Sequence, residues 1–135
     1  HMCIKEIDYM LKHIHSWNAE RKISTPFTLW PMYSALKPQP YGVVLIVSTW
    51  NYPFNLNLLP LIGAIAAGNC VIIKPSPRAT ASEKVLIKMI NSAFEKDYIH
   101  ALEGGAQVAN TLLEHQWNYI FFIKLKINRS DTHIF

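Results

Sequence analysis

A continuous apolar run from Val43 to Val47 is the feature that most limits how this chain can fold. Most of its residues are β-branched, and none needs water, which is typical of a strand buried on both faces of a sheet. A second run of this kind, Cys70 to Ile73, follows after a segment, Leu56 to Ala67, that is apolar nearly all round and rich in glycine and alanine. Strand, close-packed helix and strand together predict a parallel βαβ unit.

The same alternation continues to Phe122. Gly68-Asn69 is suited to end the first helix, and Lys74-Pro75 to stop the second strand. We expect a helix opening at Ser82-Glu83 with an apolar face, and then three further elements. The face is Val85, Leu86, Met89, Ile90, Ala93 and Phe94, and the elements are a weak strand over Ile99 to Leu102, a short helix over Ala106 to His115 and a strand over Tyr119 to Phe122. This order predicts an α/β fold with a parallel sheet and right-handed crossovers.

The residues before Gly42 have a different texture. Apolar residues at helical spacing predict an amphipathic helix that docks on another surface, and they are Ile4, Ile7, Leu11 and Ile14. Four prolines between Ser24 and Pro40 leave only loop or edge-strand structure there. We therefore divide the chain into a helical arm (1–22), a segment of strands (23–41), an α/β unit (42–122) and a tail (123–135) that breaks the alternation.

Composition excludes several classes of protein. Of 135 residues, 50% are hydrophobic and 16% are charged, so a globular domain is expected and disorder is not. The net charge of +4 is scattered, with only Lys124, Lys126 and Arg129 clustered, so a nucleic-acid partner is not expected. The longest apolar run, Leu56 to Ala67, contains a proline and is too short to span a membrane. No secretory signal pattern is present, so cytoplasmic localisation is expected.

Cysteine and histidine positions give no metal site. Cys3 and Cys70 form no CxxC pair, and His13 and His15 are too close in sequence to share a helix face. Cys70 has the pattern of a small buried hydrophobe, and a desolvated thiol is a poor nucleophile. Cys3 lies far along the sequence from the polar loop described next, so neither cysteine is expected to act as a nucleophile.

Polar residues follow each of the first two strands. The loop Ser48-Thr49-Trp50-Asn51-Tyr52 would lie at the carboxyl edge of the sheet, where open α/β folds bind ligands. The amide of Asn51 could stabilise an oxyanion, or it could cap the next helix and hold the loop. Lys74 could contact a ligand, or it could be a solvated strand end. From the residues alone, the structural interpretation is the commoner one in each case.

Three ordered motifs resemble the aldehyde dehydrogenase superfamily, and within it the class of fatty and aromatic aldehyde dehydrogenases. They are Thr49-Trp50-Asn51-Tyr52-Pro53-Phe54-Asn55, Gly63-Ala64-Ile65-Ala66-Ala67-Gly68-Asn69 and Lys74-Pro75-Ser76. The resemblance extends from Ile7 to Phe122 and covers only the first part of a typical member. It implies an incomplete Rossmann-like sheet, preceded by a helical arm and by strands of a bridging or oligomerisation element.

The resemblance also implies a role for each residue of the loop. Asn51 would donate to the oxyanion of the thiohemiacetal intermediate. Trp50, with the backbone around Ser48 and Thr49, would line the nicotinamide side of the NAD(P) pocket. Tyr52 would line the aldehyde channel, and Lys74 would contact the hydroxyls of the adenosine ribose.

One departure leaves the cofactor open between NAD and NADP. The family often has a glutamate shortly after the lysine, where it accepts from the ribose hydroxyls, and here Pro77-Arg78 stands in that place. An inward Arg78 would favour the 2′-phosphate of NADP, whereas an exposed Arg78 would have no such effect.

Other family parts are not found in this sequence. A nucleophilic cysteine, a general-base glutamate and the glycine-rich turn beside the pyrophosphate are missing, and Ile123 to Asn128 follows the last strand instead. We expect an N-terminal fragment of an NAD(P)-dependent aldehyde dehydrogenase that is inactive alone and self-associates through exposed apolar surface. The alternative is a non-catalytic module that binds nucleotide weakly or pairs with a full-length subunit.

Overall fold

A computed structural model describes residues 1–123 of the chain. The helices and strands, in chain order, are α1 (Met2–Trp17), β1 (Arg21–Ile23), η1 (Phe27–Leu29), β2 (Ser34–Leu36), β3 (Val43–Val47), α2 (Asn55–Ala66), β4 (Cys70–Lys74), η2 (Pro77–Ala79), α3 (Thr80–Ala93), β5 (Ile99–Ala101), α4 (Ala106–Glu114) and β6 (Tyr119–Phe122). The expected tail, 123–135, lies almost entirely outside the described residues, and so do Lys124, Lys126 and Arg129.

Four parallel strands form the main sheet in the order β5-β4-β3-β6. Its centre is β3, which pairs with β4 from Val43↔Cys70 to Val47↔Lys74 and with β6 from Val44↔Tyr119 to Val47↔Phe122. The predicted α/β class and parallel sheet are therefore confirmed. In this register the carboxyl ends of β3 and β4 lie beside each other. The polar segments 48–52 and 74–76 are therefore at the same edge of the sheet.

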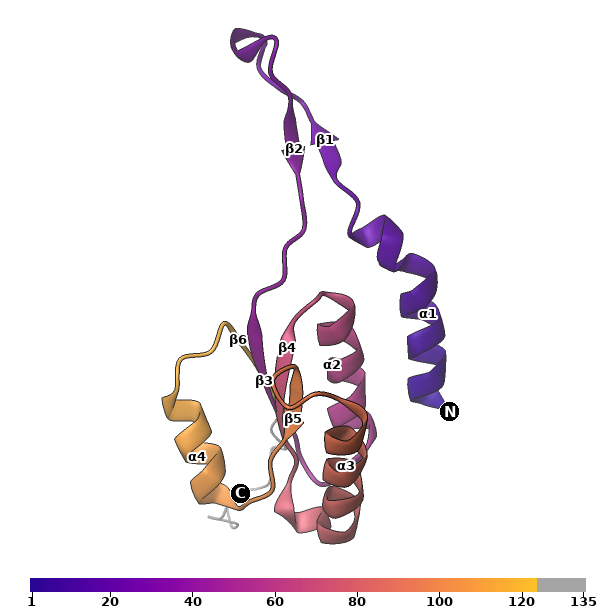
Figure 1. Ribbon diagram of the computed structural model, residues 1–135, viewed down its shortest axis with the longest axis vertical. Helices are drawn as coiled ribbons and strands as arrows, with labels where there is room; N and C mark the ends of the chain where they lie inside the picture. Colours follow the sequence, from indigo (N-terminus) through magenta and orange to yellow (C-terminus); the bar gives the residue numbers. More distant parts are fainter. Residues whose placement is uncertain (124–135) are drawn as a thin grey trace.

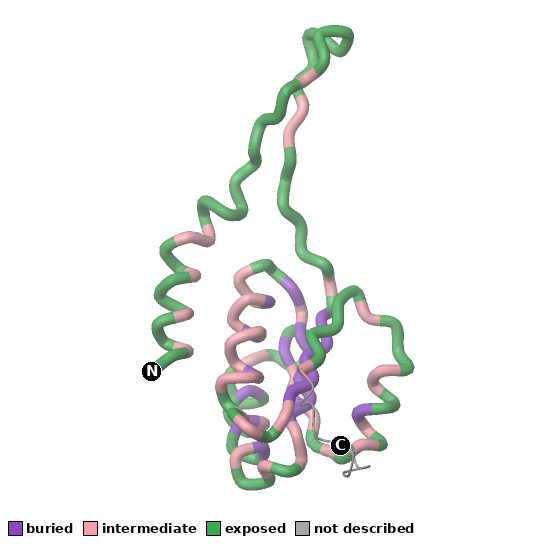
Figure 2. Tube along the Cα trace, turned by 180° about the vertical axis from the view of Figure 1, so that it is seen from behind, coloured by how far each residue is buried: buried purple, intermediate pink, exposed green. Residues whose placement is uncertain are grey.

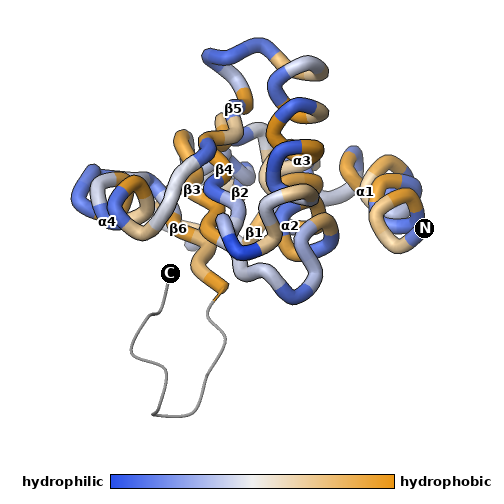
Figure 3. The backbone as a smooth tube through the Cα atoms, turned by 90° about the horizontal axis from the view of Figure 1, so that it is seen from below, coloured by the Kyte–Doolittle hydropathy of each residue, from blue (hydrophilic) through white to orange (hydrophobic). Residues whose placement is uncertain are grey.

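Helices cover both faces of this sheet. α2 and α3 lie on one face and α4 on the other, while α1 packs on the outer side of α2 (Figures 1 and 3). Alternate residues of β3 face the two layers: Val44 and Ile46 join the cluster formed with α2 and α3, and Leu45, buried to the same degree, does not belong to that cluster. Burial on both sides explains the unbroken apolar run.

Of the two edge strands, β5 and β6, the second is less protected. Its four residues, Tyr119 to Phe122, are each 38–45% exposed although all are aromatic or aliphatic. Burial is concentrated in β3, β4 and β5, whereas β6 and the arm are exposed (Figure 2). An apolar edge strand of this kind is a surface on which further chain can pair.

The proline-rich segment forms an extended arm. β1 and β2 pair antiparallel, from Arg21↔Leu36 to Ile23↔Ser34, and the ribbon projects away from the sheet (Figure 1). The expected loop or edge-strand structure is thus confirmed, with one short 3-10 turn, η1, at its tip. Three aromatic residues near this tip are mostly exposed: Phe27 at 90%, Trp30 at 77% and Tyr33 at 72%.

The N-terminal helix forms as predicted, but only part of its predicted docking face is covered within residues 1–123. Ile14 is half-buried, as are Cys3 and Met10, whereas Ile4, Ile7 and Leu11 are exposed. A stripe of residues at i, i+3, i+7, i+10 and i+11 defines the contact side, and it is Cys3, Glu6, Met10, His13 and Ile14. The spacing of the aliphatic residues fixed the helical period, but the face toward α2 is the less hydrophobic one.

No helix within residues 1–123 is both long and apolar enough to cross a bilayer.

Candidate functional site

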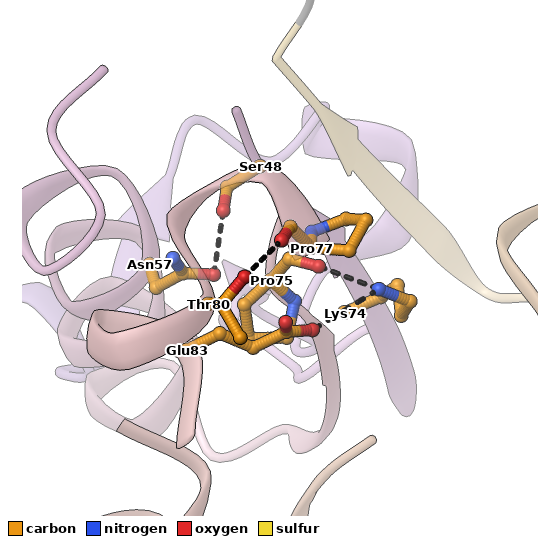
Figure 4. Close-up of polar contacts among 7 residues, drawn as sticks. All are labelled: Ser48, Asn57, Lys74, Pro75, Pro77, Thr80 and Glu83. Carbon is orange, nitrogen blue, oxygen red and sulfur yellow. Dashed lines mark hydrogen bonds and ion pairs between the residues drawn. The ribbon is translucent and has the colours of Figure 1, made fainter. Parts of the chain in front are cut away.

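The loop after β3 meets the end of β4 at the carboxyl edge of the sheet. The backbone N–H of Ser48 donates to the carbonyl oxygen of Lys74 at 3.3 Å, which extends the ladder one step beyond the paired residues. Two segments separated in sequence, 48–52 and 74–76, are therefore neighbours in space (Figure 4). The structure brings together the loop and the lysine that the sequence marked as candidates.

Asn57 closes this loop from inside α2. The hydroxyl of Ser48, which is buried, donates to Asn57 Oδ1 at 2.7 Å, and Asn57 Nδ2 donates to the carbonyl of Pro53 at 2.6 Å (Figure 4 shows the bond to Ser48). Asn57 is fully buried, and its amide oxygen and nitrogen are both satisfied. The sequence analysis missed this residue, although a lone polar residue among the leucines of an apolar helix is a signal that could have identified it.

Asn51 is held by its neighbour Thr49. The Thr49 hydroxyl donates to Asn51 Oδ1 at 2.5 Å, and both residues are half-buried. In residues 1–123, the Asn51 Nδ2 group has no hydrogen-bond partner. The interpretation of Asn51 as a helix cap is wrong, because α2 starts at Asn55 with Phe54 as its N-cap and no capping side chain.

Trp50 and Tyr52 project from the same loop toward solvent. Trp50 is 46% exposed and Tyr52 is 65% exposed. Large rings at such exposure are accessible to a ligand or to further protein surface. An open crevice does exist elsewhere, at the amino edge of the sheet, where it is lined by Ile14, Pro40 and Gly68 among others, and it receives none of the candidate residues.

Lys74 is a buried ion-pair partner, so the expectation of a solvated strand end is wrong. Only 1% of the residue is exposed, and its ammonium donates to the carbonyl of Pro75 at 2.6 Å and lies 3.7 Å from Glu83 Oε1 (Figure 4). Burial lowers the pKa of Lys74 below its usual value of 10.5, while the carboxylates of Glu83 and Glu103 act in the opposite direction. The charges of Lys74, Glu83 and Glu103 distinguish this edge of the sheet from the apolar core.

Glu83 lies in the first turn of α3, near the helix opening where the sequence placed it, but its burial was not predicted. α3 begins at Thr80, two residues before the expected start, and Glu83 is only 3% exposed. Its Oε1 atom is buried and accepts no hydrogen bond. Glu83, Leu86 and Ile90 are spaced at i, i+3 and i+7, so they share one face of α3. Because Leu86 and Ile90 are apolar and buried, this spacing could have identified Glu83 as inward-facing.

The segment that replaces the family glutamate forms η2. Pro77 and Arg78 lie in this single turn, Arg78 is exposed, and the Pro77 carbonyl accepts from the Thr80 hydroxyl at 3.1 Å (Figure 4). A carboxylate does lie beside Lys74 in space, since Glu83 Oε1 of α3 is 3.7 Å from its ammonium.

The two cysteines lie in different places relative to the Asn51 loop. Cys70 is the first residue of β4, paired with Val43, at the opposite edge of the sheet from Asn51. Cys3 is nearer than its position in the sequence suggested, because its thiol contacts Asn55 Oδ1 at 3.7 Å. No group of three or more metal-ligating side chains gathers anywhere in residues 1–123.

Comparison with known proteins gives consistent matches. A family model described as "Aldehyde dehydrogenase family" matches residues 1–123. The 4,4'-diaponeurosporen-aldehyde dehydrogenase of Staphylococcus aureus is 42% identical over 119 residues, which are 88% of this chain and 26% of that protein. Aldehyde dehydrogenase family 3 member B2 of Mus musculus is 39% identical over 121 residues, 90% of this chain and 25% of that protein.

The same similarity is present in three dimensions. The substrate-bound structure of Staphylococcus aureus AldH superposes with a TM-score of 0.85 at 42% identity, covering 89% of this chain and 26% of that one. A succinic semialdehyde dehydrogenase from Streptococcus pyogenes, solved with NADP+ as the cofactor, shares the fold at a TM-score of 0.65 and 15% identity, covering 87% and 25%. The chain spans about a quarter of the length of the curated relatives it matches.

Proposed function

The chain belongs to the aldehyde dehydrogenase family, and from that premise we propose that it supplies the N-terminal quarter of an NAD(P)-dependent enzyme that oxidises an aldehyde to a carboxylate. The observation that carries this proposal is the arrangement of the Asn51 loop. It stands at the carboxyl edge of a parallel sheet, where such folds bind ligands, and its amide has unused donors.

Asn51 is proposed as the donor to the oxyanion that forms when a nucleophile attacks the aldehyde carbonyl. A preorganised side-chain amide in this role is worth about 10²–10³ in kcat. The loop meets the requirement for preorganisation, because Asn57 ties Ser48 to Pro53 and thereby holds the residues between them. Tyr52, exposed on the same loop, is proposed to line the aldehyde channel.

The residues proposed to hold the cofactor are Trp50, the backbone of Ser48 and Thr49, and Lys74. When bound, the cofactor accepts a hydride from the substrate carbon. The buried Glu83 Oε1, with no hydrogen bond and 3.7 Å from the Lys74 ammonium, fits a ribose diol, since a hydroxyl can donate to the carboxylate and accept from the lysine. The same carboxylate would repel a 2′-phosphate, which favours NAD over NADP.

Burial limits what this chain does with a cofactor by itself. Lys74 and Glu83 are 1% and 3% exposed, so a ribose can contact them only after the residues that cover them move. We therefore expect weak cofactor affinity for the 135 residues alone.

The 135 residues are also proposed to be unable to turn over an aldehyde alone. Cys70 lies at the opposite edge of the sheet from Asn51, and the Cys3 thiol, on α1, is engaged with Asn55 Oδ1 at 3.7 Å, so neither is proposed as the nucleophile. Oxidation through a thiohemiacetal and a thioester needs a thiolate at that carbonyl.

A chimera tests the proposal. Residues 1–123 of this chain replace the matching segment of the Staphylococcus aureus relative, and the chimera and the 135-residue chain are assayed for aldehyde-dependent reduction of NAD and of NADP. We expect turnover by the chimera, with NAD preferred, and none by the isolated chain. A folded chimera without turnover would contradict the assignment of the loop, and turnover by the isolated chain would contradict its dependence on a nucleophile from elsewhere.

A second candidate function is a non-catalytic module that pairs with a full-length subunit. The exposed aromatic tip of the arm (Phe27, Trp30 and Tyr33) and the exposed apolar edge β6 favour this candidate, because surfaces of this kind are commonly covered by protein. Co-expression of the tagged chain with the untagged full-length relative tests it. Co-purification supports pairing, and recovery of the tagged chain alone removes the candidate.

A further inference from the structure

The hydrogen bond between Thr49 and Asn51 has a defined direction. Thr49 Oγ1 lies 2.5 Å from Asn51 Oδ1, within the range of O–H···O bonds. The Thr49 oxygen therefore faces the amide oxygen, not the amide nitrogen, and the hydroxyl is the donor. Oδ1 of Asn51 is thus engaged within the loop itself.

Other hydrogen bonds fix the two ends of the loop, so rotation of the Asn51 side-chain amide is the main motion left to it. The Ser48 N–H is bonded to Lys74 O, the Ser48 hydroxyl to Asn57, and the Asn57 amide to the Pro53 carbonyl. Pro53 further restricts the backbone of the residue before it. With both ends of the loop fixed, the group that Asn51 presents depends on how its amide plane is turned.

The alternative donor for Asn51 is already used. The Ser48 hydroxyl is bonded to Asn57 Oδ1 at 2.7 Å, and the Tyr52 hydroxyl, on a side chain that is 65% exposed, makes no hydrogen bond to Asn51 in residues 1–123. Thr49 is therefore the side chain that sets the Asn51 amide. Without its hydroxyl, a turn of the amide by half a revolution would exchange oxygen and nitrogen at little steric cost, because the two atoms are nearly equal in size.

This turn matters for the chemistry. An amide presents either N–H donors, which stabilise negative charge, or a carbonyl oxygen, which repels it. In residues 1–123 the Asn51 Nδ2 group has no partner, so both its protons are available once Oδ1 is bonded to Thr49.

We propose that Thr49 is a positioning residue, whose hydroxyl fixes the Asn51 amide with its N–H donors outward so that the amide presents donors to an acceptor such as a developing oxyanion. The inference rests on the proposed function only for the identity of that oxyanion. The orientation itself is a property of these residues and can be measured without turnover.

The test is the side-chain amide signal of Asn51 in the ¹⁵N-labelled 135-residue chain, assigned through its loss in Asn51→Asp. Thr49→Val removes the hydroxyl at constant volume, Thr49→Ala removes it with less bulk, and Thr49→Ser keeps it. Thr111→Val is the matched control, because it deletes another threonine hydroxyl, one that bonds Gln107 O on exposed α4. The backbone spectrum shows which variants are folded.

We expect one ordered Asn51 amide pair in the wild type, Thr49→Ser and Thr111→Val. In Thr49→Val and Thr49→Ala that pair should shift and lose order, while backbone signals outside residues 48–57 stay in place. An Asn51 amide that keeps its shift and order in both would overturn the proposal. Failure of the proposed function shows separately, as a chimera that does not turn over while the amide still responds to Thr49.

Discussion

Removing the carboxylate of Glu83 should strongly destabilise the fold. Glu83→Gln leaves the Lys74 ammonium buried at 1% exposure with only the Pro75 carbonyl as a partner. Breaking a buried ion pair in this way costs about 3–5 kcal/mol, because one charge stays desolvated without its counterion. Since a domain of this size is stable by about 5–15 kcal/mol, the loss is a large fraction of the total.

Urea denaturation followed by far-UV circular dichroism measures the effect. With a slope of about 1–3 kcal/mol per molar urea, the midpoint of Glu83→Gln should fall by about 1–5 M. The double variant Lys74→Met/Glu83→Leu, which replaces the pair by apolar side chains, should lie near the wild type or above it. Lys88→Met, a lysine on the exposed side of the same helix, should change stability by less than about 0.5 kcal/mol.

The pH dependence of the free energy of unfolding gives an independent check on the interaction between Lys74 and Glu83. The pKa of Lys74 is lowered in the folded state, so between that value and 10.5 the unfolded chain binds more protons and the contribution of Lys74 to stability rises with pH. Glu83 raises this pKa, so without Glu83 the pKa falls further and the rise begins at lower pH. The deficit of Glu83→Gln should therefore be largest near neutral pH and should narrow toward pH 10.5.

The reasoning would be refuted if Lys74→Met and Glu83→Gln each cost under about 1 kcal/mol and their effects added in the double variant Lys74→Met/Glu83→Gln. Such additivity would mean that the two groups do not interact in solution.

Two further variants test the local structure. Asn57→Ala should lower the free energy of unfolding by about 1–3 kcal/mol in urea denaturation, because the buried Ser48 hydroxyl and the Pro53 carbonyl lose their partner. The control Asn110→Ala, on the exposed side of α4, should be neutral. Equal losses in the two variants would contradict the closure of the loop by Asn57. Gly42→Ala should lower the thermal midpoint, since φ is +119° and a Cβ would lie 2.5 Å from Asn118 Oδ1. Gly63→Ala, with open space around it in α2, should instead gain about 0.5–1 kcal/mol of stability. A neutral Gly42→Ala would contradict the described turn.

The sequence predicts the sheet closely because burial on both faces leaves a pattern with no other common explanation. Val43–Val47 and Tyr119–Phe122 are strands with the predicted bounds, and Gly68, at φ +80°, follows α2 as expected. Parallel pairing followed from the alternation with helices and is confirmed.

The sequence could not show which side of α1 is covered. Ile4, Ile7 and Leu11 gave the helical period, but the contact with α2 is made through Cys3 and its neighbours on another side. A hydrophobic stripe predicts that something covers it, and this partner need not be within the described residues. The distance between Cys3 and the Asn51 loop was misjudged for a related reason, since α1 folds back beside α2.

The ion pair between Lys74 and Glu83 could not be predicted from the sequence either. Position 77 holds proline, so the sequence indicated that the carboxylate was lost, yet Glu83 supplies one from the first turn of α3. The inward turn of Glu83 depends on where η2 ends and α3 begins, and helix starts are set by local geometry that propensities fix only to within a few residues. The roles of Ser48, Trp50 and Tyr52 remain predictions from the resemblance.

The central claim is that the Asn51 loop of this chain stabilises an oxyanion in aldehyde oxidation. The most direct measurement is kcat of the active chimera against its Asn51→Ala variant, with Asn110→Ala as the matched control. The account predicts a fall of about 10²–10³-fold for Asn51→Ala and no change for Asn110→Ala. A folded Asn51→Ala chimera that keeps its kcat would contradict the claim.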